Sequence, residues 1–460
     1  MQRMMGGFVR VGLLLGGSIL VFAAGPGLAP PSRANERELT EGPAPSNADR
    51  IETPLERAFL APARKQPLIS SLSDRLDELP PFFADARLEA RFRTYYLRKD
   101  RTIDELSEAW AMGGSLYFHS GWLKDALAFE AEWFTSQPIV AEDSRDGTLL
   151  LDRGQDGYEV AGIVNAKLRY QGFVLTGYRQ YLGLPYINEN DSRMTPQTYE
   201  ALTLSKSDGK IRLSGGYIWQ TKRRNDDRFV SMAEALGVSK ERGVAYGSVL
   251  WHPNDAFYAG LSVAVLPEIV GGGYAETGYR FEVPADWSLR LDGQATYQQG
   301  DGQLFAGLAG GSYETWSTEG RISAGWKGLL FRMAVAITAD ERAIISPYGS
   351  SPSFLSLMQR DFTQRDEKAL LLSLSYDFST LGLTDLSAIV NFAQGWDARV
   401  LDRRGDAREV DVTLDYRIPP EWGWYEGLWL RLRGSWLDDD RASRDGTDFR
   451  VIFRYDFPVL

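Results

Sequence analysis

The feature that most constrains the fold of this chain is an alternation of apolar and charged residues that recurs along most of its length. It is clearest between residues 409 and 418. One set of side chains there is Val410, Val412, Leu414, Tyr416 and Ile418, and the other is Glu409, Asp411, Thr413, Asp415 and Arg417. Successive side chains of a β-strand point to opposite faces of the sheet. Each such segment therefore predicts a strand with one apolar and one charged face.

Segments with this pattern or with β-rich composition number eighteen. They are 87–98, 106–119, 126–135, 157–170, 173–182, 198–206, 210–220, 242–252, 255–265, 273–283, 287–298, 312–326, 329–338, 366–379, 384–395, 407–418, 427–437 and 448–457. Connections after even segments are mostly short, as at 171–172 and 327–328, and those after odd segments are mostly long, as at 183–197 and 339–365. Outer-membrane barrels have such short periplasmic turns and long extracellular loops. We predict an all-β fold, a transmembrane antiparallel β-barrel of 18 strands whose apolar face meets lipid and whose charged face meets a wet lumen.

The first 81 residues differ from the rest and predict export. An apolar stretch of 14 residues, Val11 to Ala24, follows Arg3 and Arg10, as in a secretory signal peptide, which we place at residues 1–34. Residues 35–81, rich in Pro, Ser, Glu and Asp, are expected to form a periplasmic leader that is mobile or weakly helical. The barrel is then residues 82–460. With a signal peptide and a predicted barrel, the expected location is the outer membrane of a Gram-negative bacterium.

Arginines on the charged face suggest what the lumen conducts. Ten of the arginines that the strand register points inward are the candidate substrate path: Arg417, Arg431, Arg433, Arg450, Arg454, Arg91, Arg93, Arg290, Arg321 and Arg332. Several lie on the last three strands and the first, which become neighbours when the barrel closes. Guanidinium stays charged and binds carboxylates through two hydrogen bonds, so this basic ladder could pass anionic solutes from site to site. Alternatively, the arginines pair with luminal acids and stiffen the wall; the candidate acids are Glu89, Glu130, Asp292, Glu409 and Asp411.

Several sequence motifs, in order, resemble the OprD family of outer-membrane porins over roughly residues 80–460. They include LPYINENDSRMTPQTYEALTL (184–204), RNDDRFVSMAEALGV (224–238), YGSSPSFLSLMQRDF (348–362), EKALLLSLSYDFSTLGL (367–383) and GLWLRLRGSW (427–436). The resemblance implies an 18-stranded barrel whose loop after the fifth strand folds inward and narrows the pore, with loop 339–365 as a second constricting element. The implied constriction residues are Tyr186, Asn188, Asp191, Ser192, Arg193, Ser346, Tyr348 and Ser350. It also implies substrate-specific passive diffusion of small carboxylate-bearing solutes, such as amino acids and aromatic or other organic acids.

Other classes of function fit the sequence less well. An enzyme is not expected, because the two histidines, His119 and His252, lie beside predicted periplasmic turns and no catalytic, cofactor or metal motif is present. The net charge is −11, or −11 − 3 = −14 without the three signal-region arginines, which disfavours nucleic-acid binding. A non-specific general porin or an envelope-anchoring barrel remains the alternative.

The expected partners are the solutes, outer-membrane lipid and lipopolysaccharide, and the barrel assembly machinery. The sequence ends in Phe457-Pro458-Val459-Leu460, where barrels of this class usually carry a terminal aromatic residue, so Phe457 is the candidate signal for assembly. Whether the barrel is a monomer or a trimer, and which carboxylate it takes, stay open.

Overall fold

Every strand expected from the alternation is present in the computed structural model. It describes residues 67–102, 106–300, 312–400, 403–418, 428–440 and 445–460. Within these ranges eighteen strands form the barrel wall: β1 (Arg87–Arg101), β2 (Ser107–His119), β3 (Leu127–Ala141), β4 (Tyr158–Tyr170), β5 (Phe173–Gln180), β8 (Thr198–Ser207), β9 (Ile211–Lys222), β11 (Val244–Asn254), β12 (Phe257–Leu266), β13 (Val270–Phe281), β14 (Trp287–Gly300), β15 (Tyr313–Trp326), β16 (Leu329–Thr338), β17 (Lys368–Asp377), β18 (Leu386–Val400), β19 (Arg403–Arg417), β20 (Trp429–Asp439) and β21 (Gly446–Pro458).

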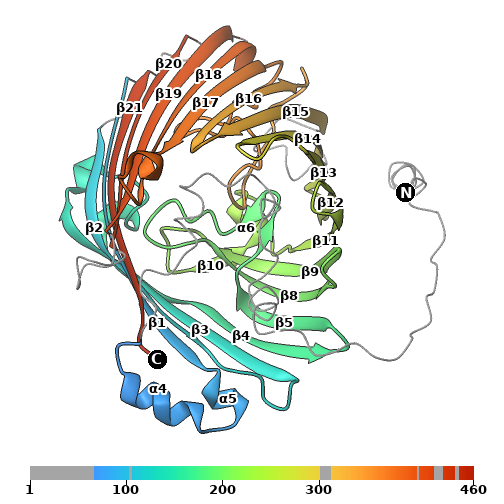
Figure 1. Ribbon diagram of the computed structural model, residues 1–460. Coiled ribbons are helices and arrows are strands. Elements are labelled where there is room, and N and C mark those ends of the chain that lie inside the picture. Colours follow the sequence, from blue (N-terminus) through green and yellow to red (C-terminus); the bar gives the residue numbers. More distant parts are fainter. Residues whose placement is uncertain (1–66, 103–105, 301–311, 401–402, 419–427, 441–444) are drawn as a thin grey trace, which may run out of the picture. The chain divides into compact units, whose positions relative to one another are not determined.

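The wall closes because its first and last strands pair with each other. β1 is antiparallel to both β2 and β21, with Arg93 opposite Arg454 in the β1–β21 register. The remaining wall strands pair antiparallel with their neighbours in chain order. A short extra strand, β10 (Phe229–Ser231), pairs with the end of β9. The prediction of a closed antiparallel 18-stranded barrel is confirmed, and Figure 1 shows the strands as a ring around an opening that loop segments enter.

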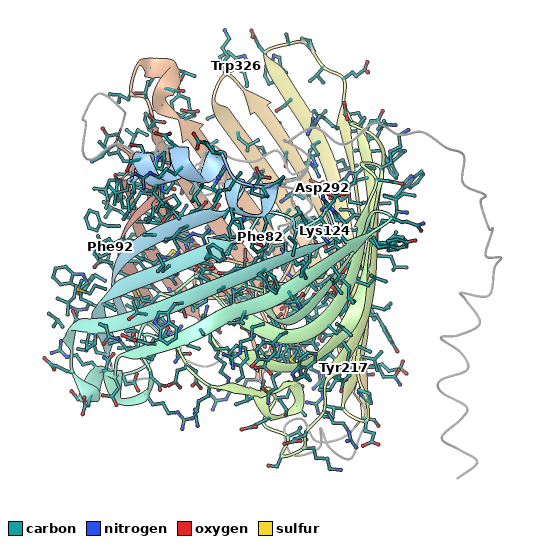
Figure 2. The ribbon with its side chains drawn as sticks, turned by 90° about the horizontal axis from the view of Figure 1, so that it is seen from below. Phe82, Phe92, Lys124, Tyr217, Asp292 and Trp326 are labelled. Carbon is teal, nitrogen blue, oxygen red and sulfur yellow. The ribbon has the colours of Figure 1, made fainter. Side chains whose placement is uncertain are left out.

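The alternation in the sequence becomes an apolar outside and a polar inside. On β16, Phe331, Met333, Val335 and Ile337 are 40–48% exposed, whereas Arg332 between them is buried. Phe92 and Tyr217 on other strands are likewise exposed (Figure 2). Exposed apolar side chains on a transmembrane barrel face the hydrocarbon of the bilayer, so their exposure to the surroundings is stabilising. No helix in the described part of the chain is both long and apolar enough to span a membrane.

Loop lengths follow the predicted parity for most connections, with exceptions: β18 ends at Val400 and β19 begins at Arg403, a short link where a long one is expected, whereas β19 ends at Arg417 and β20 begins only at Trp429. Long connections cover 142–157, 181–197, 223–243 and 339–367, but β12 and β13 are joined by only residues 267–269. Several strands also run beyond their predicted ends; β3, for example, continues to Ala141 rather than 135. Tilted barrel strands can continue past the lipid band, where the apolar face is no longer needed, so alternation underestimates their length.

The long loops contain the short elements that alternation did not predict. They are the hairpin β6 (Gly183–Leu184) and β7 (Ile187–Asn188), the helix α6 (Met232–Ala235), and the 3-10 turns η1 (Asp143–Arg145) and η2 (Arg153–Gln155). A third 3-10 turn, η3 (Phe378–Leu381), lies between β17 and β18. These elements give the loops internal hydrogen bonds, which a loop needs when it folds into the barrel instead of remaining in bulk solvent.

Two short helices precede the barrel, α4 (Ser70–Asp77) and α5 (Pro81–Ala84). The backbone N–H of Leu68 donates to the carbonyl of Pro458 at 2.9 Å, and Gly121 N–H donates to Phe82 at 3.0 Å. This segment is therefore hydrogen-bonded to the end of β21 and to the turn after β2. The predicted signal peptide, 1–34, and the leader up to residue 66 lie outside the described residues.

Substitution of Gly114 by alanine should destabilise the barrel. Gly114 on β2 has φ +135°, and an added Cβ would lie 1.8 Å from the Arg91 carbonyl oxygen of β1. Backbone strain of this kind costs about 1–3 kcal/mol before any clash is counted. We expect the variant to unfold at a lower concentration of guanidinium chloride. On gels of unheated samples, the faster-migrating folded band should be lost. Gly320→Ala on β15, where nothing lies within 4 Å, is the matched control, and equal behaviour of the two variants would contradict the prediction.

Candidate functional site

The loop at 181–197 folds into the barrel through its β6–β7 hairpin. At its tip, the Tyr186 hydroxyl lies 2.7 Å from Thr296 Oγ1 on the buried face of β14. The Tyr186 ring also packs edge-to-face against Tyr274 of β13, with ring centroids 6.4 Å apart. The loop starts at β5, so the tip is fixed to a part of the wall distant from β5 along the sheet. It therefore extends into the lumen rather than over the rim.

The second loop, 339–367, is also bound to the inner wall. Luminal side chains of several strands hold its backbone. Gln298 of β14 accepts from the Ile345 N–H (3.0 Å) and donates to the Ile345 carbonyl (2.9 Å), Gln294 of β14 donates to the Pro352 carbonyl (3.0 Å), and Glu319 of β15 accepts from the Phe354 N–H (2.7 Å). Asp411 and Glu409 of β19 accept from the N–H groups of Met358 (3.0 Å) and Gln359 (2.7 Å), and Arg450 of β21 donates to the Met358 carbonyl (3.2 Å). Glu409 and Asp411 were candidate partners for arginines; within the described residues they instead hold this loop and form no ion pair.

The two loops meet as the resemblance implied. Asn188 Oδ1 accepts from the Ser350 N–H at 2.8 Å and from its hydroxyl at 2.9 Å, and Asn188 Nδ2 donates to the Ser350 carbonyl at 2.9 Å. Tyr348 accepts from Asn188 N–H at 3.3 Å and donates its hydroxyl to Met232 of α6 at 2.7 Å. Burial raises the pKa of Tyr348, so it stays a donor. Ser346 is half-buried on the same loop but makes none of these contacts.

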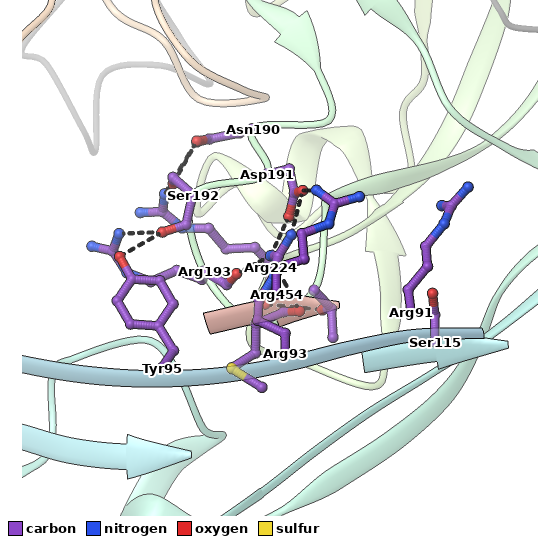
Figure 3. A network of polar contacts seen from close by, with 12 residues as sticks. Arg91, Arg93, Tyr95, Ser115, Asn190, Asp191, Ser192, Arg193, Arg224 and Arg454 are labelled. Atoms are coloured by element: carbon purple, nitrogen blue, oxygen red, sulfur yellow. Dashed lines mark hydrogen bonds and ion pairs between the residues drawn. The ribbon is translucent and has the colours of Figure 1, made fainter. Parts of the chain in front are cut away.

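Asp191 of the 181–197 loop lies against arginines of strands β1 and β21 (Figure 3). Arg93 donates two hydrogen bonds to Asp191, from Nη1 to Oδ1 at 2.6 Å and from Nη2 to Oδ2 at 2.8 Å. Arg454 Nη1 lies 3.9 Å from Asp191 Oδ2. Ser192 Oγ donates to Asn190 at 2.8 Å, and Arg224 binds both residues. Asp191 is thus bound to β1 and Ser192 to Arg224, so this part of the loop is held from both sides.

Arg193 has a different place from its neighbours. It is 5% exposed, its Nε donates to the Thr148 carbonyl at 2.8 Å and its Nη1 to the Ser192 carbonyl at 2.7 Å. Burial, reinforced by the positive charge of Arg450, lowers the pKa of Arg193 to about 9. Its contacts join two loops to each other, and so little of it is exposed that it contributes scarcely any surface to a solute path.

Seven of the ten predicted ladder arginines lie on four adjacent strands. Arg417 is on β19, Arg431 and Arg433 on β20, Arg450 and Arg454 on β21, and Arg91 and Arg93 on β1. The strand registers place Arg433 opposite Arg450 and Arg454 opposite Arg93. The other three, Arg290, Arg321 and Arg332, are buried on β14, β15 and β16. The predicted ladder is therefore one contiguous basic wall of seven residues and a separate group of three.

Most of these arginines have an acidic partner. Four pairs are two residues apart on one strand: Arg450 with Asp448 (2.7 Å), Arg454 with Asp456 (2.6 Å), Arg290 with Asp292 (2.7 Å) and Arg91 with Glu89 (3.2 Å). Arg431 bonds Asp415 across strands at 2.8 and 3.0 Å. Arg433 differs, because its Nε donates to the Thr413 hydroxyl at 3.1 Å and it forms no ion pair with any residue in the described ranges. Glu89 and Asp292 were among the candidate acids for such pairing, whereas Asp448 and Asp456 were not, although their spacing of two from an arginine on one face is visible in the sequence.

Comparison with known proteins identifies this architecture. The model of the OprD family, described as outer membrane porins, matches residues 80–459. OccK9 (OpdG) of Pseudomonas aeruginosa is similar in structure, with TM-score 0.76 and 24% identity over 82% of this chain and 100% of that one. OpdK of the same organism, solved with vanillate, has TM-score 0.73 and 23% identity over 82% and 100%. OccAB1 of Acinetobacter baumannii has TM-score 0.75 and 18% identity over 84% and 99%.

No curated protein matches the sequence. The match to the family model covers the barrel and the loops 181–197 and 339–367, from the end of the leader to the last strand. The chain therefore belongs to the OprD family and is a porin of the Gram-negative outer membrane.

Proposed function

We propose that this porin carries out substrate-specific passive diffusion of small carboxylate-bearing solutes, such as amino acids and aromatic or other organic acids, along its basic wall. The observation that supports this most is the arginine face of β20, β21 and β1, which lies beside the point where Asp191 of the 181–197 loop enters the lumen. A solute that passes the narrowed section has to pass these guanidinium groups.

The chemistry of the wall suits a carboxylate. Guanidinium offers five N–H donors and can bind both carboxylate oxygens at once. Arg431, Arg433 and Arg454 are each only partly buried, so donors remain accessible. Conduction requires contacts that are favourable but weak enough to release the solute. The acidic partners of Arg431 and Arg454 reduce the attraction of each site, which supports stepwise passage rather than trapping.

The structural neighbour solved with vanillate supports the choice of aromatic carboxylates as probes. Vanillate carries one carboxylate on a ring, which combines the anionic group that the arginines would bind with a flat apolar body. We infer that solutes of this shape, together with amino acids, form the first set to test.

Single-channel conductance of the purified protein in planar bilayers tests the proposal. Benzoate, vanillate and amino acids are added in turn, with benzamide as a neutral control of the same shape as benzoate. A small conductance that falls saturably with one carboxylate, and not with benzamide, is expected. A large, weakly cation-selective conductance indifferent to every solute would contradict the proposal and favour a general porin.

A further inference from the structure

A cavity beside the Arg93–Asp191 pair is lined by equal numbers of positive and negative side chains. Its volume is about 40 Å³. The charged residues that line it are Arg91, Arg93, Arg454, Glu132, Asp191 and Asp456. Three guanidinium groups and three carboxylates give +3 − 3 = 0. Such a volume holds about three water molecules, and a carboxylate group is of similar size. An anion could therefore enter next to the arginines, but it would meet no net positive charge there.

Asp191 is the one carboxylate of the three that comes from a loop. Glu132 and Asp456 belong to strands β3 and β21, whereas Asp191 is carried into the lumen by the 181–197 loop. Its two oxygens occupy the fork of Arg93 at 2.6 and 2.8 Å, which is the geometry in which a guanidinium binds a free carboxylate. Arg454 approaches the same Oδ2 at 3.9 Å. The chain thus places its own carboxylate where a solute carboxylate would bind.

The Asp191 carboxylate is ionised and accessible. Burial alone would raise its pKa, but the charge and hydrogen bonds of Arg93, followed by the charge of Arg454, hold the pKa below its usual value. Its side chain is 21% exposed and that of Arg93 is 12% exposed. Both groups therefore touch the solvent of the lumen, and an incoming anion can replace Asp191 at Arg93 without unfolding the wall.

We propose that Asp191 is a tethered counter-ion that occupies the anion site of Arg93 and Arg454 and competes with each passing anion. This rests on the proposed function and deepens it. The competition lowers the affinity of the site for the solute and favours release, which a conducting path needs. Removing the Asp191 charge leaves the cavity with +1, so anions should bind more tightly and leave more slowly.

The test compares wild type with Asp191→Asn, Asp191→Glu and Asp286→Asn in planar bilayers. Asp286→Asn removes the same charge from the turn after β13, where the side chain is 65% exposed, and serves as the control. For Asp191→Asn we expect a half-blocking benzoate concentration about tenfold lower, because the charge-assisted hydrogen bonds of Asp191 no longer compete with the solute carboxylate for Arg93. In a KCl gradient, the reversal potential of this variant should shift toward the equilibrium potential of chloride. Asp191→Glu, which keeps a carboxylate on a longer arm, should remain close to wild type.

The outcomes separate this inference from the proposed function. An unchanged or higher half-blocking concentration in Asp191→Asn would overturn the counter-ion role, because a merely loosened loop raises conductance without tightening anion binding. If benzoate and the other carboxylates block neither wild type nor Asp191→Asn, the proposed function fails. The reversal potential then tests the counter-ion role by itself. A shift toward the equilibrium potential of chloride in Asp191→Asn supports that role, and no shift overturns it.

Discussion

Replacing Glu409 and Asp411 together with alanine is expected to release the 339–367 loop from β19 and to raise the single-channel conductance, with strong fluctuation. The two carboxylates accept the N–H groups of Gln359 and Met358 at 2.7 and 3.0 Å. Hydrogen bonds to charged groups each contribute about 1.5–3 kcal/mol. Losing both should favour the released loop by a factor of about 100 or more.

The amide variant Glu409→Gln/Asp411→Asn is the matched control for this release. Each amide keeps one carbonyl oxygen in nearly the same place, so the backbone N–H groups of the loop keep their acceptors. We expect this variant to stay close to wild type in conductance and noise. Both proteins should first show the heat-modifiable folded band. A quiet, unchanged conductance in the folded double-alanine variant would mean that the anchors on β14, β15 and β21 hold the loop without β19.

The barrel was predictable from the sequence because a membrane barrel imposes one rule on every strand. On β19, Val412 and Leu414 face lipid while Asp411 and Thr413 face the lumen, and the same period of two, or a β-rich composition, marks each of the eighteen segments. Closure then follows, since an open sheet edge cannot exist in hydrocarbon. This reasoning needs no information on packing, which is why the strand count and the order of turns and loops were accessible from alternation alone.

The constriction was less accessible, because its contacts depend on how irregular loops pack. No periodicity places Asn188 against Ser350 or predicts that Gln298 binds the backbone of Ile345. Those residues were reached only through resemblance or not at all. The acidic partners of the arginines are an intermediate case. Asp448 and Arg450 share one face of a strand by their spacing alone, so an inward arginine two residues from an acid predicts a pair, as it did for Arg290 and Asp292.

Replacing Arg433 with glutamine is expected to weaken carboxylate binding about tenfold, the cost of one charge-assisted hydrogen bond. Arg433 should contribute most among the wall arginines because it forms no ion pair within the described residues; its Nε donates to Thr413 at 3.1 Å, and Asp411 acts on it only through longer-range attraction. Its guanidinium is therefore the strongest attraction for a solute carboxylate along β20. The measurement is the half-blocking concentration of benzoate, or of the solute that blocks best, in single-channel recordings.

The neighbouring pair provides the control for Arg433→Gln. Arg431 is neutralised by Asp415 at 2.8 and 3.0 Å, and Asp415 is 2% exposed, so replacing Arg431 alone would leave a buried charge without its partner and damage the wall. The double variant Arg431→Gln/Asp415→Asn removes both charges and keeps the net charge of the wall. It should alter the half-blocking concentration far less than Arg433→Gln does. Equal weakening by the two variants would contradict this prediction. It would mean that the affinity depends on how many guanidinium groups contact the solute, and not on the excess of arginines over nearby acids.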